Sequence, residues 1–311
     1  MEEITQAQHF KTAVLFLIFN RLDTTKRVFD VIRKARPPRL YIGSDGPREQ
    51  KEGEAEKVQA VREYIRNNID WDCEVKTLFR EKNIGCKYAV SSAVTWFFEH
   101  EDMGIILEDD CLPSFSFFAF CEELLIHYKN DKRVWQIGGC NFQDGIKRGD
   151  ADYYFSAINH IWGWASWADR WKFYDAELDN IQVSSFIKSY WSGKAFKYFD
   201  KIFWIMKKKE MDTWDYQWTF SMWKNNGLAI LPNVNMISNI GFGENSGRTI
   251  DNNHSNTVNL TTHEINIFNI KYPIQVVRNK EADEYTYEKY FSMKTSFIRR
   301  AINKLFRILK P

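Results

Sequence analysis

Continuous apolar stretches alternate with amphipathic stretches through the first half of the chain. The apolar stretches predict strands over residues 13–19, 39–46, 73–80, 103–109 and 134–142. The amphipathic stretches between them predict helices over residues 23–35, 54–68, 85–100 and 114–130. Buried strands that alternate with helices are typical of a mostly parallel sheet covered on both faces. We therefore expect an α/β fold.

The second half is less regular, with a helical pattern over 196–210, a short apolar strand over 228–232 and a Gly/Asn-rich loop over 239–249. No linker marks a boundary near residue 150. We expect two lobes of one domain, 1–150 and 151–285, followed by a tail, 286–311.

Polar residues follow each predicted strand, where a parallel sheet binds its ligands. They include Asn20 and Arg21, Asp45, Arg80 and Asn83, and the acid triplet Glu108, Asp109 and Asp110. Three adjacent carboxylates repel one another, so a compensating partner is expected. A divalent ion that bridges a diphosphate would serve, because Mg²⁺ and Mn²⁺ favour carboxylate and phosphate oxygens. The alternative is that Asp110 or Ser114 caps the helix that follows.

The amino-acid composition limits the classes of protein to which the chain can belong. The 311 residues are 44% hydrophobic and 27% charged with a net charge of +2, which indicates a globular protein with no general affinity for nucleic acid. Five cysteines without a C-x-x-C pair favour a reducing compartment. No signal peptide precedes the first strand, and its apolar run is too short to span a bilayer. We expect a cytoplasmic protein. The glycine-rich motifs of P-loop and dinucleotide-binding proteins are absent.

Seven short pieces resemble, in the same order, those of GT-A glycosyltransferases. They are VLFLIFNR, SDGPR, NIGC, ILEDD, WGWASW, WDYQW and NIGFG, within residues 13 to about 245. Within that family the chain is similar to the group of the N-acetylglucosaminyltransferase that starts complex N-glycans, and to bacterial hemolytic-protein-like nucleotide-diphospho-sugar transferases. The resemblance implies a Rossmann-like sheet with a nucleotide-sugar lobe and a smaller acceptor-binding lobe.

The resemblance also implies residue roles. Asp110 would bind Mn²⁺ or Mg²⁺, and Asp215 would be the general base. The residues implied for the nucleotide sugar, together with the rim residues that follow the predicted strands, are Asn20, Arg21, Asp45, Arg80, Asn83, Glu108, Asp109, Ser246 and Arg248. In WDYQW, Tyr216 and Gln217 stand where the N-glycan enzyme has a second acid, so Asp212 is the fallback base.

Chemistry supports these roles independently of the family. A metal would stabilise the charge on the leaving diphosphate, and a carboxylate would take the proton of the acceptor hydroxyl. A single base opposite the leaving group implies inversion of the anomeric carbon. Aromatic residues and a glycine could contact the acceptor, or the same aromatic segment could form a hydrophobic hinge: Trp162, Gly163, Trp164 and Trp214.

The tail over 294–311 carries six Lys and Arg residues and no acid, with its apolar residues on one helical face. This pattern predicts an amphipathic helix at an anionic membrane surface, or a helix packed on the body. We expect a metal-dependent inverting transferase that moves a hexose or N-acetylhexosamine from a UDP-sugar to a glycan or lipid-linked glycan in surface polysaccharide synthesis. The alternatives are a non-catalytic binder of nucleotide sugars or glycans, and a membrane-active protein.

Overall fold

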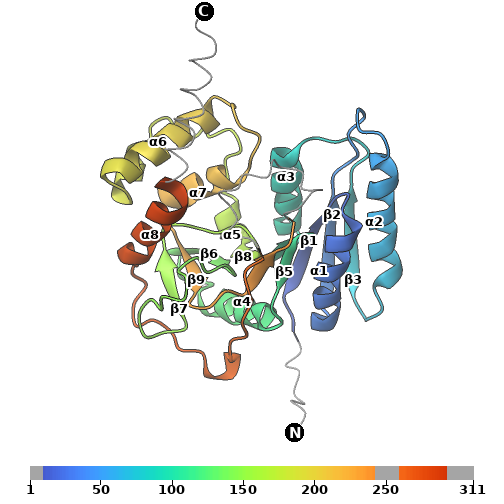
Figure 1. Cartoon of the computed structure of the whole chain (residues 1–311), viewed down its shortest axis with the longest axis horizontal. Helices are drawn as coiled ribbons and strands as arrows, with labels where there is room; N and C mark the ends of the chain where they lie inside the picture. The colour runs from blue at the N-terminus through green and yellow to red at the C-terminus, as the bar shows by residue number, and fades with distance from the viewer. Residues whose placement is uncertain (1–9, 242–258, 293–311) are drawn as a thin grey trace, which may run out of the picture.

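The computed structural model describes residues 10–241 and 259–292. Its centre is an eight-stranded sheet in the order β3-β2-β1-β4-β8-β6-β9-β7 (Figure 1). The strands are β1 (Ala13–Ile18), β2 (Arg39–Ser44), β3 (Glu74–Phe79), β4 (Met103–Glu108), β6 (Val134–Gly138), β7 (Tyr153–Ser156), β8 (Trp164–Trp167) and β9 (Leu228–Pro232). Only β7 and β8 run against the others. The predicted α/β class with a mostly parallel sheet is therefore confirmed.

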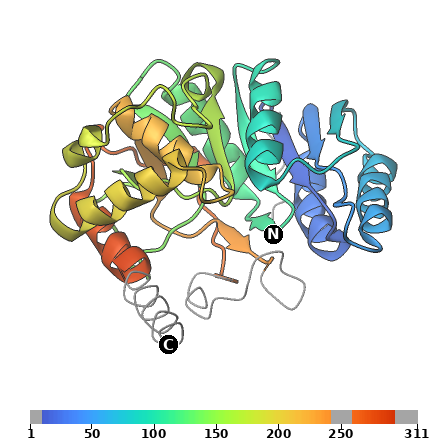
Figure 2. The same cartoon turned by 90° about the horizontal axis from the view of Figure 1, so that it is seen from above.

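Helices cover both faces of this sheet (Figures 1 and 2). They are α1 (Leu22–Ala35), α2 (Glu54–Asn68), α3 (Cys86–Phe98), α4 (Ser116–His127), α5 (Ala168–Trp171), α6 (Gly193–Lys207), α7 (Asp215–Lys224) and α8 (Lys280–Thr286). Short 3₁₀ segments occur at Ser185–Ser189 and Ile267–Asn269, and a π-helical segment, Tyr287–Ser292, continues α8. A separate two-stranded ribbon pairs β5 (Cys111–Pro113) with β10 (Ile237–Asn239).

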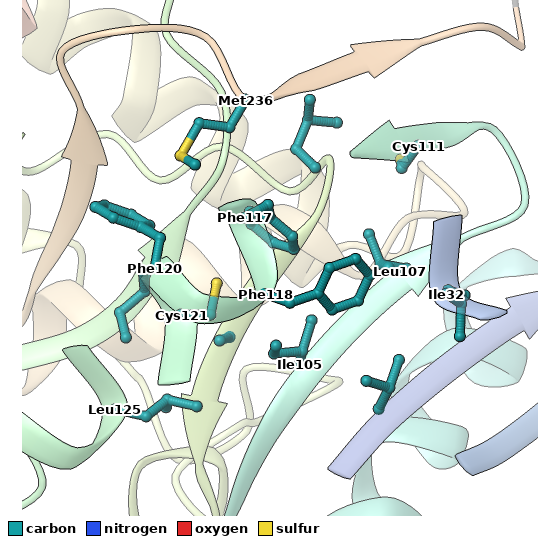
Figure 3. Close-up of a cluster of buried hydrophobic side chains, with 14 of the residues drawn as sticks. Ile32, Ile105, Leu107, Cys111, Phe117, Phe118, Phe120, Cys121, Leu125 and Met236 are labelled. Atoms are coloured by element: carbon teal, nitrogen blue, oxygen red, sulfur yellow. The ribbon is translucent and has the colours of Figure 1, made fainter. Parts of the chain in front are cut away.

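The core follows the alternation of side chains along buried strands. In β1, Val14, Phe16 and Ile18 belong to one apolar cluster, whereas Ala13, Leu15 and Leu17 belong to a second. Successive strand residues point to opposite faces, so a fully apolar strand supplies both clusters. The first cluster packs under α1, α2 and α4, and Figure 3 shows the α4 aromatics against strand residues such as Ile105 and Leu107. The second packs under α3, α5, α6 and α7.

Strand β8 lies in the middle of the sheet although it belongs to the second half of the sequence. It pairs antiparallel with β4 and with β6, and so it separates two strands that are close in sequence. Its residues form the segment WASW, for which the sequence predicted an acceptor surface or a hinge. The two halves of the chain thus share one sheet.

The predicted elements between residues 13 and 142 are present, with ends that differ by a few residues. The second half contains elements that the apolar pattern did not predict, among them β7, β8 and β10, which are short. No helix in the described ranges is long and apolar enough to cross a membrane. The predicted amphipathic tail over 294–311 lies outside the described residues.

Candidate functional site

The candidate site lies beyond the carboxyl ends of β1 and β4. These two parallel strands are neighbours in the sheet. Strands β2 and β3 lie beyond β1 and strand β8 lies beyond β4, so the strand order changes direction between β1 and β4. A crevice forms at such a switch point, and ligands of open α/β sheets bind there. Arg21 follows β1 and the acids Asp109 and Asp110 follow β4, so this point holds the charged residues that the sequence singled out.

The Arg21 guanidinium binds both acids. Its Nη2 donates to Asp109 Oδ1 and to Asp110 Oδ2, the latter at 2.9 Å. The side chains of Arg21 and Asp110 are 22% and 17% exposed, so the pair borders on solvent, whereas Asp109 is buried. Burial raises the pKa of the Asp109 carboxyl, although Arg21 opposes that shift. Burial also lowers the pKa of Arg21, but the two carboxylates raise it above its ordinary value. The chain thus supplies a cation for two of its three adjacent acids.

Gly241 packs against the ion pair formed by Arg21 and Asp110. Its carbonyl accepts a hydrogen bond from Arg21 Nη1 at 3.4 Å. A Cβ at position 241 would lie 2.2 Å from Asp110 Oδ2 and 2.5 Å from Arg21 Nη1. Only glycine allows the backbone to approach this ion pair so closely. Gly241, the middle residue of the motif NIGFG, therefore packs directly on Asp110 of the acid triplet.

A second polar group extends the site along the end of β1. The Asn20 amide donates to Glu54 Oε1 at 2.9 Å, and Glu54 also binds the Arg48 guanidinium. Hydrogen bonds from Arg48 lower the pKa of the Glu54 carboxyl to about 2. Arg48 lies 5.6 Å from the ring centroid of Phe19. The position of Asn20 is therefore fixed by an ion pair between the loop after β2 and the start of α2.

The loops after β2 and β3 meet at Asp45. Its carboxylate accepts from the backbone N–H groups of Gly46 and Ile84, and the Asn83 amide donates to the Gly46 carbonyl at 2.8 Å. Burial raises the pKa of Asp45, against the opposing effect of these hydrogen bonds and of Arg80. Arg80 itself donates to Ser92 Oγ at 2.7 Å. The four rim loops thus form a continuous polar edge, as their positions after the strands predicted.

The acid triplet does not cap the following helix. Asp110 contacts Arg21 and the Cys111 thiol, and the N–H groups of Phe115 and Ser116 at the start of α4 donate instead to Glu264, at 3.0 and 2.6 Å. Ser114 Oγ is buried with no hydrogen-bond partner in the described part of the chain. The alternative reading of Asp110 or Ser114 as a helix cap is therefore wrong, because a distant carboxylate takes that role.

The residues around Asp110 fit a divalent ion only in part. The described segments bring together no group of three or more His, Cys, Asp or Glu side chains that could hold a metal. Asp110 offers carboxylate oxygens at a partly exposed position, which suits Mg²⁺ or Mn²⁺. The described residues alone would not complete the coordination of an ion there. Oxygens of a bound ligand could supply what these residues lack.

The two candidate bases lie in different surroundings. Asp212 accepts from the N–H groups of Cys86 and Lys87 at 3.2 and 3.1 Å, so it caps the start of α3. Asp215 is the first residue of α7 and is partly buried. Its Oδ1 accepts from the Thr213 hydroxyl and from the N–H of Tyr216, whereas Oδ2 has no hydrogen bond to any described residue. Hydrogen bonds thus fix one carboxylate oxygen of Asp215, Oδ1, and leave Oδ2 without a partner among the described residues.

The tryptophans lie mostly in the core. Trp164 and Trp214 are 1% and 2% exposed, and their rings stack at 5.7 Å. Gly163 has a φ of +62°, and a Cβ there would meet Ile237 Cδ1 at 2.4 Å, so its close contact is with a core side chain. Trp162 is only partly buried and packs edge-on against Phe142. Of these four residues, Trp162 retains the most accessible surface.

Two predicted residues, Ser246 and Arg248, lie outside the described residues. Glu108, the last residue of β4, lies in register beside Leu17 of β1. Sequence reasoning missed Glu54, Arg48 and Arg62. The last of these donates from Nη2 to the carbonyls of Asp45 and Arg80 at 2.9 and 2.8 Å, and so fixes both loops. Arg48 ends the motif SDGPR, which was the available signal for it.

No protein-family model matches the chain, and no curated protein does. Among solved structures it is similar to the mannosyltransferase PcManGT from Pyrobaculum calidifontis, in complex with GDP-Man and Mn²⁺, with 14% identity and a TM-score of 0.35 over 52% of this chain. The chain spans about half of that protein, 46% of its length.

Two further solved structures are similar at the same low level. The galactosyltransferase LgtC, in complex with donor and acceptor sugar analogs, has 14% identity and a TM-score of 0.34 over 67% of this chain and 69% of its own. TarS from S. aureus has 9% identity and a TM-score of 0.41 over 73% of this chain and 59% of its own. Such identities and scores are too low to assign an activity. These proteins are what the chain is similar to, and its activity has to be argued from its own residues.

Proposed function

We propose that the chain is a metal-dependent inverting glycosyltransferase of the GT-A type. It transfers a hexose or N-acetylhexosamine from a UDP-sugar to a hydroxyl of a glycan or lipid-linked glycan, and it acts in surface polysaccharide synthesis. The observation that carries the proposal is the cluster of Arg21, Asp109 and Asp110 at the switch point between β1 and β4. The motif order along the chain adds the nucleotide-sugar character.

In this proposal different rim residues bind different parts of the donor. Asp45 and Asn20, each fixed by its own hydrogen bonds, lie beside the nucleoside. Arg21 lies beside the diphosphate, and Asp109 holds its guanidinium in place. Asp110 would hold the divalent ion. When bound, that ion would stabilise the negative charge that develops on the leaving diphosphate.

Asp215 is the proposed general base. Its Oδ1 is engaged by Thr213 and by the N–H of Tyr216, so the carboxylate is oriented before an acceptor binds. Oδ2 would accept the proton of the acceptor hydroxyl while that hydroxyl attacks the anomeric carbon. The bond to the diphosphate breaks on the opposite face of the sugar, and the configuration inverts. Asp212 is less suited, because it already accepts two N–H groups of α3.

Calorimetric titration of UDP, first with Mn²⁺ and then with EDTA, tests the donor site. Wild type should bind UDP only with the metal, and Asp110→Ala should lose that binding. Mn²⁺ alone should bind weakly, since the described residues offer no complete ligand set. Asp102→Ala is the matched control, because the Asp102 side chain is 87% exposed. UDP binding that needs neither the metal nor Asp110 would overturn the metal site.

Hydrolysis of a UDP-sugar by the same variants tests catalysis. Asp215→Asn should retain UDP binding and lose about 10²–10⁴-fold in rate, the usual effect of a general base. Full activity in Asp215→Asn would exclude this residue as the base. A wild-type protein that binds UDP-sugars but turns none over would instead be the non-catalytic binder.

A further inference from the structure

A second cavity, of about 730 Å³, lies away from the switch point, between the start of α6 and the segment formed by α8 and its π-helical continuation. Figure 1 shows α6 and α8 on the same side of the molecule, beside α7. Four cationic side chains line this cavity: Lys188, Lys194, Arg278 and Lys280. Its chemistry is therefore different from that of the acidic donor site.

The three lysines have no carboxylate partner among the described residues. Within the described residues, no carboxylate lies within ion-pair distance of Lys188, Lys194 or Lys280, and Lys188 Nζ lies 5.6 Å from the ring centroid of Phe196. Arg278 is fixed in place, because its Nε donates to the buried Asp283 and its Nη1 to the Tyr190 carbonyl. Its guanidinium also lies 4.6 Å from the ring centroid of Trp191. The cavity is therefore lined by one cation that hydrogen bonds hold in place, Arg278, and by three lysines without a carboxylate partner.

Backbone N–H groups at the start of α6 add to this positive field. Helix α6 is 15 residues long, no acid occupies its first turn, and its N-cap residue Ser192 makes no side-chain capping bond. The N–H groups of the first turn are thus available to an anion. Trp191, which also lines the cavity, has its Nε1–H buried without a hydrogen-bond partner in the described segments. The cations and the open N–H groups at the start of α6 favour an acceptor-rich ligand, whereas the Trp191 Nε1–H is enclosed by the protein.

The remaining lining residues suit a polyhydroxyl compound. Glu284 and Glu288 can accept hydrogen bonds from hydroxyl groups, and Tyr287 supplies an aromatic wall. Tyr287 also connects the cavity to the proposed base. Its ring lies 6.0 Å from that of Tyr198, whose hydroxyl is 3.2 Å from the hydroxyl of Tyr216, the residue after Asp215. One ring contact and one hydrogen bond therefore connect the cavity to the segment of the proposed base.

We propose that this cavity binds a phosphate group on the acceptor glycan, which makes the acceptor a phosphorylated sugar. The assignment of the ligand as an acceptor rests on the proposed function. The phosphate site itself rests on the lysines, Arg278 and the start of α6. Charge-assisted hydrogen bonds from several donors to one phosphate are the strong class of such contacts.

Calorimetry with glucose 6-phosphate tests the proposal, with UDP and Mn²⁺ present in excess to fill the donor site. Inorganic phosphate is the sugar-free probe and glucose the neutral one. Glucose 6-phosphate and phosphate should bind to wild type, and glucose should bind more weakly than its phosphate. The double variant Lys188→Gln/Lys194→Gln should bind both phosphates about tenfold more weakly or worse, because hydrogen bonds to charged groups are worth more than neutral ones.

The matched control is Lys197→Gln/Lys201→Gln, which removes the same charge from exposed positions of α6 that do not line the cavity. It should bind all probes like wild type, and both double variants should keep UDP binding. Equal losses in the two double variants, or UDP binding without any binding of glucose 6-phosphate and phosphate, would overturn the proposal. Selective phosphate binding without UDP binding would support the cavity and overturn the donor site instead.

Discussion

The Arg21 guanidinium joins three segments that are far apart in the sequence, since it contacts Asp109, Asp110 and the Gly241 carbonyl. Removing it would leave two carboxylates close together, one of them buried. Breaking a buried pair costs more than the pair contributes, because the remaining charge is unpaired. At the residue scale, the positions of Asp109, Asp110 and Gly241 therefore all depend on the Arg21 side chain.

Gly241→Ala should disrupt this contact. The added methyl group would overlap Asp110 Oδ2 and Arg21 Nη1, so one of them has to move. We expect a loss of about 1–3 kcal/mol in the free energy of unfolding, measured with urea, as for other overpacked sites. Under the proposed function, UDP binding should weaken as well.

A double-mutant cycle supplies the control. If the methyl group acts through the ion pair, Gly241→Ala should cost less in an Arg21→Ala background than in wild type. Additive losses in the cycle would show that the glycine is needed for another reason.

Two helices of the parallel half are capped from the second half of the chain. Asp212 accepts from the first N–H groups of α3, and Glu264 from those at the start of α4. The amphipathic pattern predicted both helices, because it depends on residues within each helix. It could not predict the caps, since their carboxylates lie 126 and 149 positions away. At the element scale, the local pattern fixes the helix and the tertiary fold supplies its end.

Asp212→Ala should lower the free energy of unfolding by about 1 kcal/mol, the usual cost of losing a helix cap. Asp212→Asn, which keeps one acceptor oxygen, should lose less. Chemical denaturation measures both. Asp102→Ala, at an exposed position, should stay within about 0.5 kcal/mol of wild type. If Asp212→Ala is as stable as that control, the contact with α3 contributes nothing.

The sheet as a whole shows how far the sequence predicts the fold. Long apolar strands such as β1 and β4 are evident in the sequence because both of their faces are buried. The rim residues followed from their positions after such strands. Strand β8 was not predicted, because its four residues WASW combine small and aromatic side chains and lack an apolar run. Of the three tryptophans that suggested a sugar surface, Trp164 and Trp214 instead lie in the core.

The stability of the whole molecule should fall in acid through two buried groups. Burial lowers the pKa of His160 from 6.5 to about 3, so the unfolded chain binds its proton first as the pH falls. This contribution is fully present above pH 6.5 and is lost towards pH 3, with a slope of up to about 1.4 kcal/mol per pH unit. The lowered pKa of Glu54 adds a loss between pH 4.5 and about 2.

Burial raises the pKa of Asp109 to about 6, so this carboxyl acts in the opposite direction over the same range, and only the difference between wild type and a histidine variant, measured in urea between pH 7 and pH 4.5, isolates His160. His160→Phe should flatten the curve in that range, because the variant has no imidazole to protonate there. His100→Phe, at an exposed position, is the control and should keep the slope of wild type. Equal slopes in wild type and His160→Phe would show that His160 does not account for the acid sensitivity.

The place of β8 between β4 and β6 has a consequence for the order of folding. Until residues 164–167 have left the ribosome, the edge of β4 that pairs with β8 is open. The segment that carries Arg21 and the acid triplet therefore reaches its final form only after the second half has been synthesised. A nascent chain that stalls before that point exposes a sheet edge on which other chains can pair.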